Sequence, residues 1–262
     1  MKILASLAAA LFAFAFSAYA QSPPTPSAAA KAQLASTGKL RLGFTINNAN
    51  YATQPPGDKP AGIGVDIGEA LAAQLGVPLE IVRYNETSAV INDAAAGKWD
   101  VALLAVEASR KASMDFSAPY AISKNSYIVP AASPLRDIAE VDTKGVRVAV
   151  SNRTAQHAYL STSIKNASLV EQPNNNASEK ELLEGRVDAM AANQSTLEGI
   201  MARAPGYRVL PGSYLDVQYS VAVPKGRDAA AAYVDAFMKH MRASGAIAKA
   251  LERAQLKGVT VP

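Results

Sequence analysis

The most informative segment of the sequence is Gly97-Lys98-Trp99-Asp100, with Arg110 ten residues further on. Arg110 lies within Ser109-Arg110-Lys111-Ala112-Ser113-Met114-Asp115-Phe116-Ser117-Ala118-Pro119-Tyr120. Between them, the apolar run 101–106 predicts a strand that is buried on both faces. Arg110 then falls at the head of a helical turn just past that strand. A guanidinium in this place can bind both oxygens of a carboxylate. The alternative is a surface arginine paired with Asp115 or Glu107.

Outward from this stretch, strand-like and helix-like segments alternate along the chain. Before Tyr120 the pattern predicts strands at 40–46, 79–84 and 101–106, and helices at 65–75 and 90–96. After Tyr120 it predicts strands at 126–130, 145–150, 169–172, 187–192, 207–210 and 217–223. The helices expected there are 134–141, 154–161, 178–184, 196–202 and 228–242, with a final turn around 245–254. Such alternation is typical of parallel α/β architecture.

The two halves of the chain share a short motif. Gly97-Lys98-Trp99-Asp100 in the first half and Gly185-Arg186-Val187-Asp188 in the second each join a helix to a strand. This similarity suggests two lobes of related build. Ligands of open α/β sheets bind at the carboxyl ends of the strands, so two facing sheets would form a pocket between the lobes.

The N-terminal residues predict export. Residues 1–20 carry one charge, Lys2, then an apolar run at 3–16 and Ala18-Tyr19-Ala20, which fits a signal peptide cleaved after Ala20. The run is shorter than the roughly 20 residues that a membrane span requires. Residues 21–36 are expected to form a flexible leader, with a short helix possible from residue 28. These features predict a periplasmic protein.

The composition narrows the classes of function. The chain has no cysteine, which excludes disulfides and metal–thiolate sites. Its 26 basic and 22 acidic residues are scattered, so nucleic-acid binding has little support. No catalytic or nucleotide-binding motif is present, and His157 and His240 lie far apart in the sequence. We therefore expect no cofactor, no metal and no catalytic residue.

Several motifs together identify a family resemblance. They are Lys39-Leu40-Arg41-Leu42-Gly43, Gly62-Ile63-Gly64-Val65-Asp66-Ile67, Gly97-Lys98-Trp99-Asp100, Arg110-Lys111, Asp115-Phe116-Ser117-Ala118-Pro119-Tyr120 and Gly185-Arg186-Val187-Asp188-Ala189. Over residues 39–251 the chain resembles the family 3 (polar amino-acid-binding) solute-binding proteins of ABC importers, which have the type II periplasmic binding fold. This resemblance implies one lobe of residues 37–122 plus 219–262, a second lobe of 123–218, and crossing segments near 121–125 and 216–219.

The resemblance also implies a function. The lobes would close on an amino acid or a related small carboxylate, and the closed monomer would dock on an inner-membrane ABC permease. Periplasmic cyclohexadienyl dehydratases resemble the same fold, but their acidic residue in the second lobe corresponds to Thr196 here, which argues against that activity. A sensor that passes its closed form to a membrane receptor is the remaining alternative.

The expected ligand-binding residues follow from the same resemblance. Arg110, with Thr154 and Ala155 at a helix N-terminus, would hold the ligand carboxylate. Asn193 stands where the family places an aspartate for the ligand ammonium, so either the ligand lacks an ammonium or another acid, Glu107 or secondly Glu86, binds it. A simpler explanation of Glu107 is a first-turn helix acid paired with Arg110. The other expected positions are Ala105, Asn47, Asn48, Tyr51, Asn85 and Thr87. Asn47 and Asn48 are also compatible with a simple loop.

Overall fold

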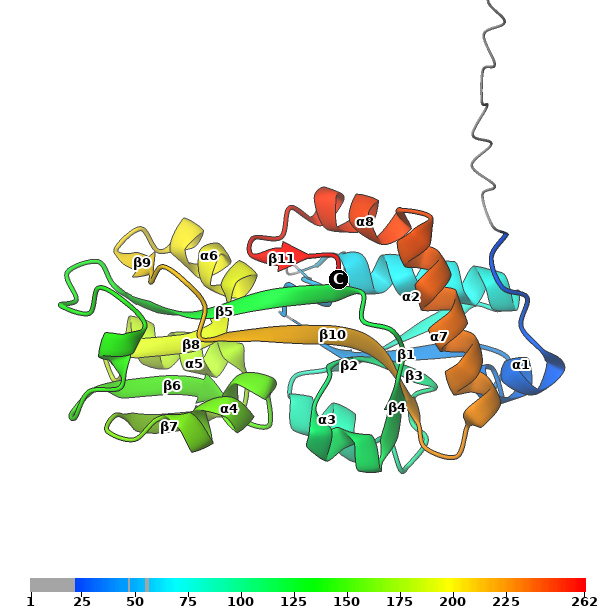
Figure 1. The fold of residues 1–262 in the computed structure, drawn as a ribbon, viewed down its shortest axis with the longest axis horizontal. Coiled ribbons are helices and arrows are strands. Elements are labelled where there is room, and N and C mark those ends of the chain that lie inside the picture. The colour runs from blue at the N-terminus through cyan, green and yellow to red at the C-terminus, as the bar shows by residue number, and fades with distance from the viewer. Residues whose placement is uncertain (1–21, 47, 55–56) are drawn as a thin grey trace, which may run out of the picture.

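The structure, a computed structural model, describes residues 22–46, 48–54 and 57–262. Two α/β lobes lie side by side, and two long strands, β5 and β10, run from one into the other (Figure 1). All strands belong to one sheet with the main order β2-β1-β3-β10-β5-β8-β6-β7. This arrangement confirms the expected α/β fold with two lobes.

The first lobe is built on three parallel strands. They are β2 (Leu79–Tyr84), β1 (Leu40–Thr45) and β3 (Val101–Ala105). Its helices are α1 (Ala28–Leu34), α2 (Ile63–Leu75), α3 (Thr87–Asn92), α7 (Asp228–Ala243) and α8 (Ala246–Ala254), with a 3-10 turn at Ala108–Ala112. Every residue of β3 is buried, as expected for a central strand with a continuous apolar run.

The second lobe repeats this design. Its strands are β6 (Arg147–Ser151), β7 (Ser168–Gln172), β8 (Ala189–Asn193) and β9 (Tyr207–Val209), and β6 is parallel to both β7 and β8. Its helices are α4 (Ala155–Ser163), α5 (Asn175–Leu183) and α6 (Gln194–Arg203), with a 3-10 turn at Ala139–Val141. Each lobe contains hydrophobic clusters of its own, so each lobe has a separate core.

An antiparallel pair of strands connects the lobes. β5 (Ala121–Pro130) and β10 (Leu215–Pro224) pair from Ala121 opposite Tyr219 to Asn125 opposite Leu215. Two short strands extend this connection: β4 (Met114–Phe116) pairs with β10, and β11 (Val259–Thr260) pairs with β5. The crossing segments expected from the sequence lie in this ladder.

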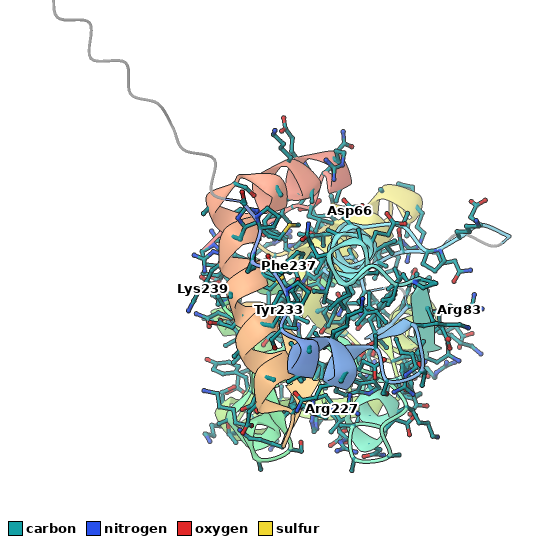
Figure 2. The ribbon with its side chains drawn as sticks, turned by 90° about the vertical axis from the view of Figure 1, so that its right-hand side faces the viewer. Asp66, Arg83, Arg227, Tyr233, Phe237 and Lys239 are labelled. Carbon is teal, nitrogen blue, oxygen red and sulfur yellow. The ribbon has the colours of Figure 1, made fainter. Side chains whose placement is uncertain are left out.

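Helix α7 closes the outer side of the first lobe. Tyr233 and Phe237 point from one face of α7 into the core, and both are buried, whereas Lys239 points outward (Figure 2). Helix α1 packs against α7 with Leu34 fully buried. The amphipathic pattern predicted for 228–242 therefore matches a helix that covers the sheet.

The repeated Gly-x-x-Asp motif forms the same interaction in both lobes. The Asp100 carboxylate accepts two bonds from the Arg41 guanidinium, at 2.9 and 2.7 Å, and one from the Arg41 backbone N–H. Asp188 accepts the equivalent three bonds from Arg147. In each lobe this pair ties the turn before one strand to the start of its neighbour. The Asp100 pair is buried and the Asp188 pair is half exposed.

Residues 28–34 form the short helix α1, whose start is capped by the Ser27 hydroxyl and whose Leu34 is buried. Two other expectations are corrected. The helix expected at 134–141 is only a 3-10 turn at its end, since no long apolar face is available there. The helix expected at 90–96 begins earlier, at Thr87, and ends at Asn92.

Candidate functional site

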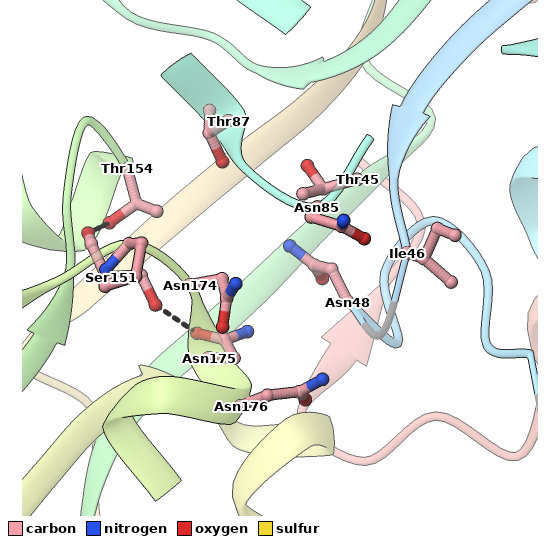
Figure 3. Close-up of a pocket in the computed structure, with 11 residues that line it drawn as sticks. Thr45, Ile46, Asn48, Asn85, Thr87, Ser151, Thr154, Asn174, Asn175 and Asn176 are labelled. Atoms are coloured by element: carbon pink, nitrogen blue, oxygen red, sulfur yellow. Dashed lines mark hydrogen bonds between the residues drawn. The ribbon is translucent and has the colours of Figure 1, made fainter. Parts of the chain in front are cut away.

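A polar cavity lies between the lobes, where strands of both lobes end. It follows the carboxyl ends of β1 and β2 in the first lobe and of β6 and β7 in the second. Its volume is about 40 Å³, and the empty space around it, about 430 Å³, includes open solvent. Its lining residues are Thr45, Ile46, Asn48, Asn85, Thr87, Ser151, Thr154, Pro173, Asn174, Asn175 and Asn176 (Figure 3). This is the position in which open α/β sheets bind ligands.

The first-lobe wall contributes hydroxyl and amide groups. Thr45 is the last residue of β1, and its buried hydroxyl has no hydrogen-bond partner in the described part of the chain. The loop after β1 is held by the Asn48 side chain, whose Oδ1 accepts from the backbone N–H of Asn50 at 3.1 Å. Thr87 begins α3, directly after Asn85 and Glu86 at the end of β2.

The second-lobe wall consists of two helix N-termini. Thr154 caps α4: its hydroxyl accepts from the backbone N–H of His157 at 3.1 Å and donates to the carbonyl of Ser151 at 2.7 Å. Asn174 caps α5 by accepting from the N–H of Ala177 at 2.9 Å. The Ser151 hydroxyl donates to Asn175 Oδ1 at 2.7 Å and so ties the two helix starts together (Figure 3). The threonine N-cap expected from the sequence is thus present.

Arg110 lies beside this cavity and not in its wall. The residue is 4% exposed, and its Nη1 donates to the carbonyl of Ala105 at 2.7 Å. Its Nη2 donates to the carbonyl of Arg153, in the second lobe, also at 2.7 Å. Glu107 lies 3.6 Å from the same nitrogen. The guanidinium is therefore shared between the two lobes, and its Nε has no partner among the described residues.

Asn193 and Tyr51 occupy structural positions. Asn193 is buried and caps α6, because its Oδ1 accepts from the N–H of Thr196 at 2.9 Å. Its Nδ2 reaches across to Asn48 Oδ1 at 3.2 Å. Tyr51 is 3% exposed and meets Tyr219 edge to face, with ring centroids 5.4 Å apart. Burial raises the pKa of both phenols, so both remain protonated at neutral pH.

The structure brings together part of the expected set. Asn48, Thr87, Thr154 and also Asn85 line the cavity, whereas Ala105, Glu107, Arg110, Ala155, Tyr51 and Asn193 do not. Asn47 lies outside the described residues. Sequence reasoning missed Thr45, Ser151 and the asparagines 174–176. A run of three asparagines, separated from the strand at 169–172 only by Pro173, was a usable signal, because it places amides near a carboxyl strand end.

An outer groove adjoins the cavity between the loop after β1, α6 and the end of α8. Asn175 and Asn176 border both the cavity and this groove. The groove contains two acid–base pairs, Asp66 with Arg253 at 2.7 Å and Glu179 with Arg203 at 2.5 Å. The groove also contains Glu198 and Lys257, so its lining is charged, in contrast to the neutral lining of the cavity.

Over residues 22–262, apart from 47, 55 and 56, no group of three or more His, Cys, Asp or Glu side chains is placed to hold a metal ion. Within the same part of the chain, none of the helices combines the length and the hydropathy that a membrane span requires.

Two lobes joined by a pair of crossing strands, with a polar cavity between them at the strand ends, define a type II periplasmic binding protein. The family model for bacterial extracellular solute-binding proteins, family 3, matches residues 40–255, and the chain belongs to this family.

Curated relatives are binding proteins for different amino acids. An L-arginine-binding protein of Pseudomonas aeruginosa is 25% identical over 218 residues, which cover 79% of this chain and 83% of the relative. A probable histidine-binding protein of Campylobacter jejuni is 29% identical over 56% of this chain and 57% of the relative. The glutamine-binding protein GlnH of Bacillus subtilis is 26% identical over 55% of this chain and 53% of the relative.

Solved structures share the fold. An amino acid ABC transporter substrate-binding protein from Streptococcus pneumoniae, bound to L-arginine, is 25% identical with a TM-score of 0.76, over 84% of this chain and 96% of that one. A mutant of ArgBP from T. maritima is 23% identical with a TM-score of 0.78, over 86% of this chain and 99% of that one. An ancestral amino acid-binding protein, a precursor of cyclohexadienyl dehydratase, is 23% identical with a TM-score of 0.75, over 85% and 98%.

Proposed function

We propose that this chain is the substrate-binding component of an ABC importer and captures an amino acid or a related small polar carboxylate by closure of its lobes. The observation that carries the proposal is the cavity whose two walls come from different lobes. A ligand in this cavity contacts both walls only when the lobes are together. Its binding energy, about 8 kcal/mol for a micromolar ligand, therefore stabilises the closed arrangement.

We propose different roles for the residues expected in the site. Asn48, Thr87 and Thr154 contact the ligand, because they line the cavity. Arg110 positions the segment before α4, since it holds the carbonyl of the residue that precedes Thr154. Asn193 acts through Asn48, whose amide it orients. Glu107 balances the charge of Arg110.

The cellular setting belongs to the same proposal. Residues 1–20 are a signal peptide cleaved after Ala20, and the mature chain is a periplasmic monomer that docks on an inner-membrane permease. The lobes comprise residues 37–122 plus 219–262 and residues 123–218, so that the boundary runs through the β5–β10 ladder. Docking of a closed form on a partner lets the importer distinguish the loaded protein from the empty one.

Binding rather than catalysis is favoured by the chemistry of the cavity. The residues that line it carry hydroxyl, amide and apolar side chains, and none of them titrates near neutral pH. A dehydratase requires a proton donor with a tuned pKa. At the position of that donor in the related enzymes stands Thr196, whose N–H is bonded to Asn193. Incubation with prephenate or arogenate tests this alternative directly, and formation of an aromatic product would support it.

A thermal-shift screen of amino acids, their amides and small organic acids tests the proposed function. A true ligand raises the melting temperature through mass action and reduces the radius of gyration in solution scattering. One variant on each wall, Asn48→Ala and Asn175→Ala, should weaken the response, while Asn166→Ala, at an exposed site in the second lobe, should not. If no small carboxylate raises the melting temperature, the transport proposal is wrong. Pull-down of a permease rather than a membrane receptor separates an importer from a sensor.

A further inference from the structure

On the first-lobe side of the cavity, hydrogen bonds fix which end of the Asn48 amide group faces the ligand space. The Asn48 Oδ1 atom accepts two hydrogen bonds, from the N–H of Asn50 at 3.1 Å and from Asn193 Nδ2 at 3.2 Å. Because a backbone N–H can only donate, the oxygen of Asn48 must face Asn50. The Nδ2 group of Asn48, with its two protons, is left for the cavity.

On the second-lobe side, too, the amide oxygens of asparagines already accept hydrogen bonds. Asn174 Oδ1 accepts from the backbone N–H of Ala177, and Asn175 Oδ1 accepts from the Ser151 hydroxyl. The bond from a backbone N–H fixes the oxygen of Asn174, so that Asn174 also offers its Nδ2 group. With its Oδ1 on the Ser151 hydroxyl, Asn175 presents its Nδ2 group in the same way. Figure 3 shows Asn48 and Asn174 on opposite sides of the gap. Hydrogen-bond donors thus line both walls of the cavity.

Two helix starts add backbone donors. α4 and α5 each have nine residues, and both begin at the cavity. The N–H groups of Ala155 and Gln156, and those of Asn175 and Asn176, have no acceptor among the described residues. Such N–H groups carry the positive end of the helix dipole and favour an anion.

An independent observation marks the first-lobe wall as a binding surface. The Thr45 hydroxyl lines the cavity, its residue is 93% buried, and it has no partner among the described residues. A buried hydroxyl without a partner is unfavourable unless a ligand completes its hydrogen bonds. The two nearby acids do not place a negative charge in the cavity. Glu86 accepts from the Ser88 hydroxyl, Glu107 lies beside Arg110, and neither lines the cavity.

We propose that the cavity selects a small carboxylate of net negative charge, bound by the Nδ2 groups of Asn48, Asn174 and Asn175 and by the N-termini of α4 and α5. This inference rests on the proposed function and names the substrate class of the same site. A cationic ligand such as arginine or histidine would meet donors and no carboxylate in this lining. The chain would therefore differ in specificity from the relatives named for those two amino acids.

Calorimetric titration of the mature chain tests the substrate class. The probes are succinate, L-malate, L-aspartate and L-glutamate as net anions, L-glutamine as a neutral ligand, and L-arginine and L-histidine. At least one anion should bind about tenfold or more tightly than glutamine, with no measurable binding of arginine. Tighter binding of arginine, histidine or glutamine overturns the inference but leaves the proposed function in place. Failure of every probe to bind contradicts both.

A matched pair of variants at Asn174 tests the donor directly. Aspartate and serine are both good helix N-caps, so Asn174→Asp and Asn174→Ser should each keep α5 and the melting temperature of the free protein. The aspartate places a negative charge where the Nδ2 donor was, and repulsion should weaken binding of the anion about a hundredfold or more. The serine removes only a donor and should weaken it about tenfold or less. Equal affinity of Asn174→Asp and the unaltered chain overturns the proposal.

Discussion

Arg110 Nη2 donates to the backbone carbonyl of Arg153 at 2.7 Å, and this bond joins the first lobe to the second. Arg153 forms a second bond between the lobes, because its own Nη1 donates to Asn92 Oδ1 in the first lobe at 2.9 Å. Arg153 also has a left-handed backbone, with a φ of 55°. The two arginines therefore fix the loop that leads into Thr154, and the start of α4 depends on a residue of the other lobe.

Removal of the Arg110 side chain should lower stability and weaken ligand binding. In Arg110→Ala the carbonyls of Ala105 and Arg153 lose their donors, which we expect to lower the free energy of unfolding by about 1–3 kcal/mol. Urea unfolding measures this change. Lys111→Ala, at the exposed neighbour, should stay within about 0.5 kcal/mol of the unaltered chain. Equal stability of both variants would show that Arg110 does not join the lobes.

The two Gly-x-x-Asp motifs should differ in their contribution to stability. Asp100→Asn removes a fully buried charge that faces Arg41 and Arg227, and should lower the free energy of unfolding by about 3 kcal/mol. Asp188→Asn removes the equivalent but half-exposed charge, so its effect should be clearly smaller. Denaturant unfolding of the two variants compares them, and equal losses would contradict the difference in burial.

Acid should destabilise the second lobe through its paired carboxylates. The Arg147 guanidinium lowers the pKa of Asp188, and backbone N–H groups, chiefly that of Ala167, lower the pKa of Asp142. A lowered folded-state pKa contributes stability above the unfolded-state value of about 3.9, which is lost as the pH falls through the folded-state pKa. Between pH 7 and pH 2, the free energy of unfolding should therefore fall less steeply in Asp188→Asn than in the unaltered chain. The same pH dependence in both proteins would mean that protonation of Asp188 does not contribute to the loss of stability in acid.

Two glycines in helices should respond to alanine in opposite directions. A Cβ at Gly64 in α2 would lie 2.1 Å from Leu103 Cδ1 and 2.7 Å from the carbonyl oxygen of Tyr51, so Gly64→Ala should be destabilising by more than about 1 kcal/mol. At Gly199 in α6 the nearest atom is 3.7 Å away. Gly199→Ala should therefore stabilise the chain by about 0.5–1 kcal/mol, measured by thermal unfolding. A stable Gly64→Ala variant would refute the close approach of α2 to the loop at Tyr51.

Local sequence was sufficient for most of the fold. The apolar run at 101–106 predicted a buried strand, and β3 occupies 101–105; Thr154 was expected as an N-cap and is one. These features depend on neighbouring residues only. The short strands β4 and β11 were not predicted, because each forms only by pairing with a long crossing strand.

The site was less predictable because it depends on how the lobes meet. Arg110 was expected to bind the ligand carboxylate, and this stays a prediction; in the structure its Nη1 and Nη2 donate to two carbonyls, one of them in the other lobe. Asn193 stays a predicted ligand contact; in the structure it caps α6 and donates to Asn48. Conversely, Asn174 and Asn175 come into the site only because the end of β7 faces the end of β1. The run of asparagines signals amides near a strand end, but long-range contacts decide which strand ends face each other.

A crystal structure of the mature chain with the tightest-binding carboxylate from the titration tests most directly whether the ligand joins the two lobes. We expect one ligand in the cavity, with carboxylate oxygens within hydrogen-bond distance of Asn174 and of the first N–H groups of α4, and with contacts to both lobes. A ligand bound in the outer groove beside Arg253, or one that touches a single lobe, would contradict this mode of binding.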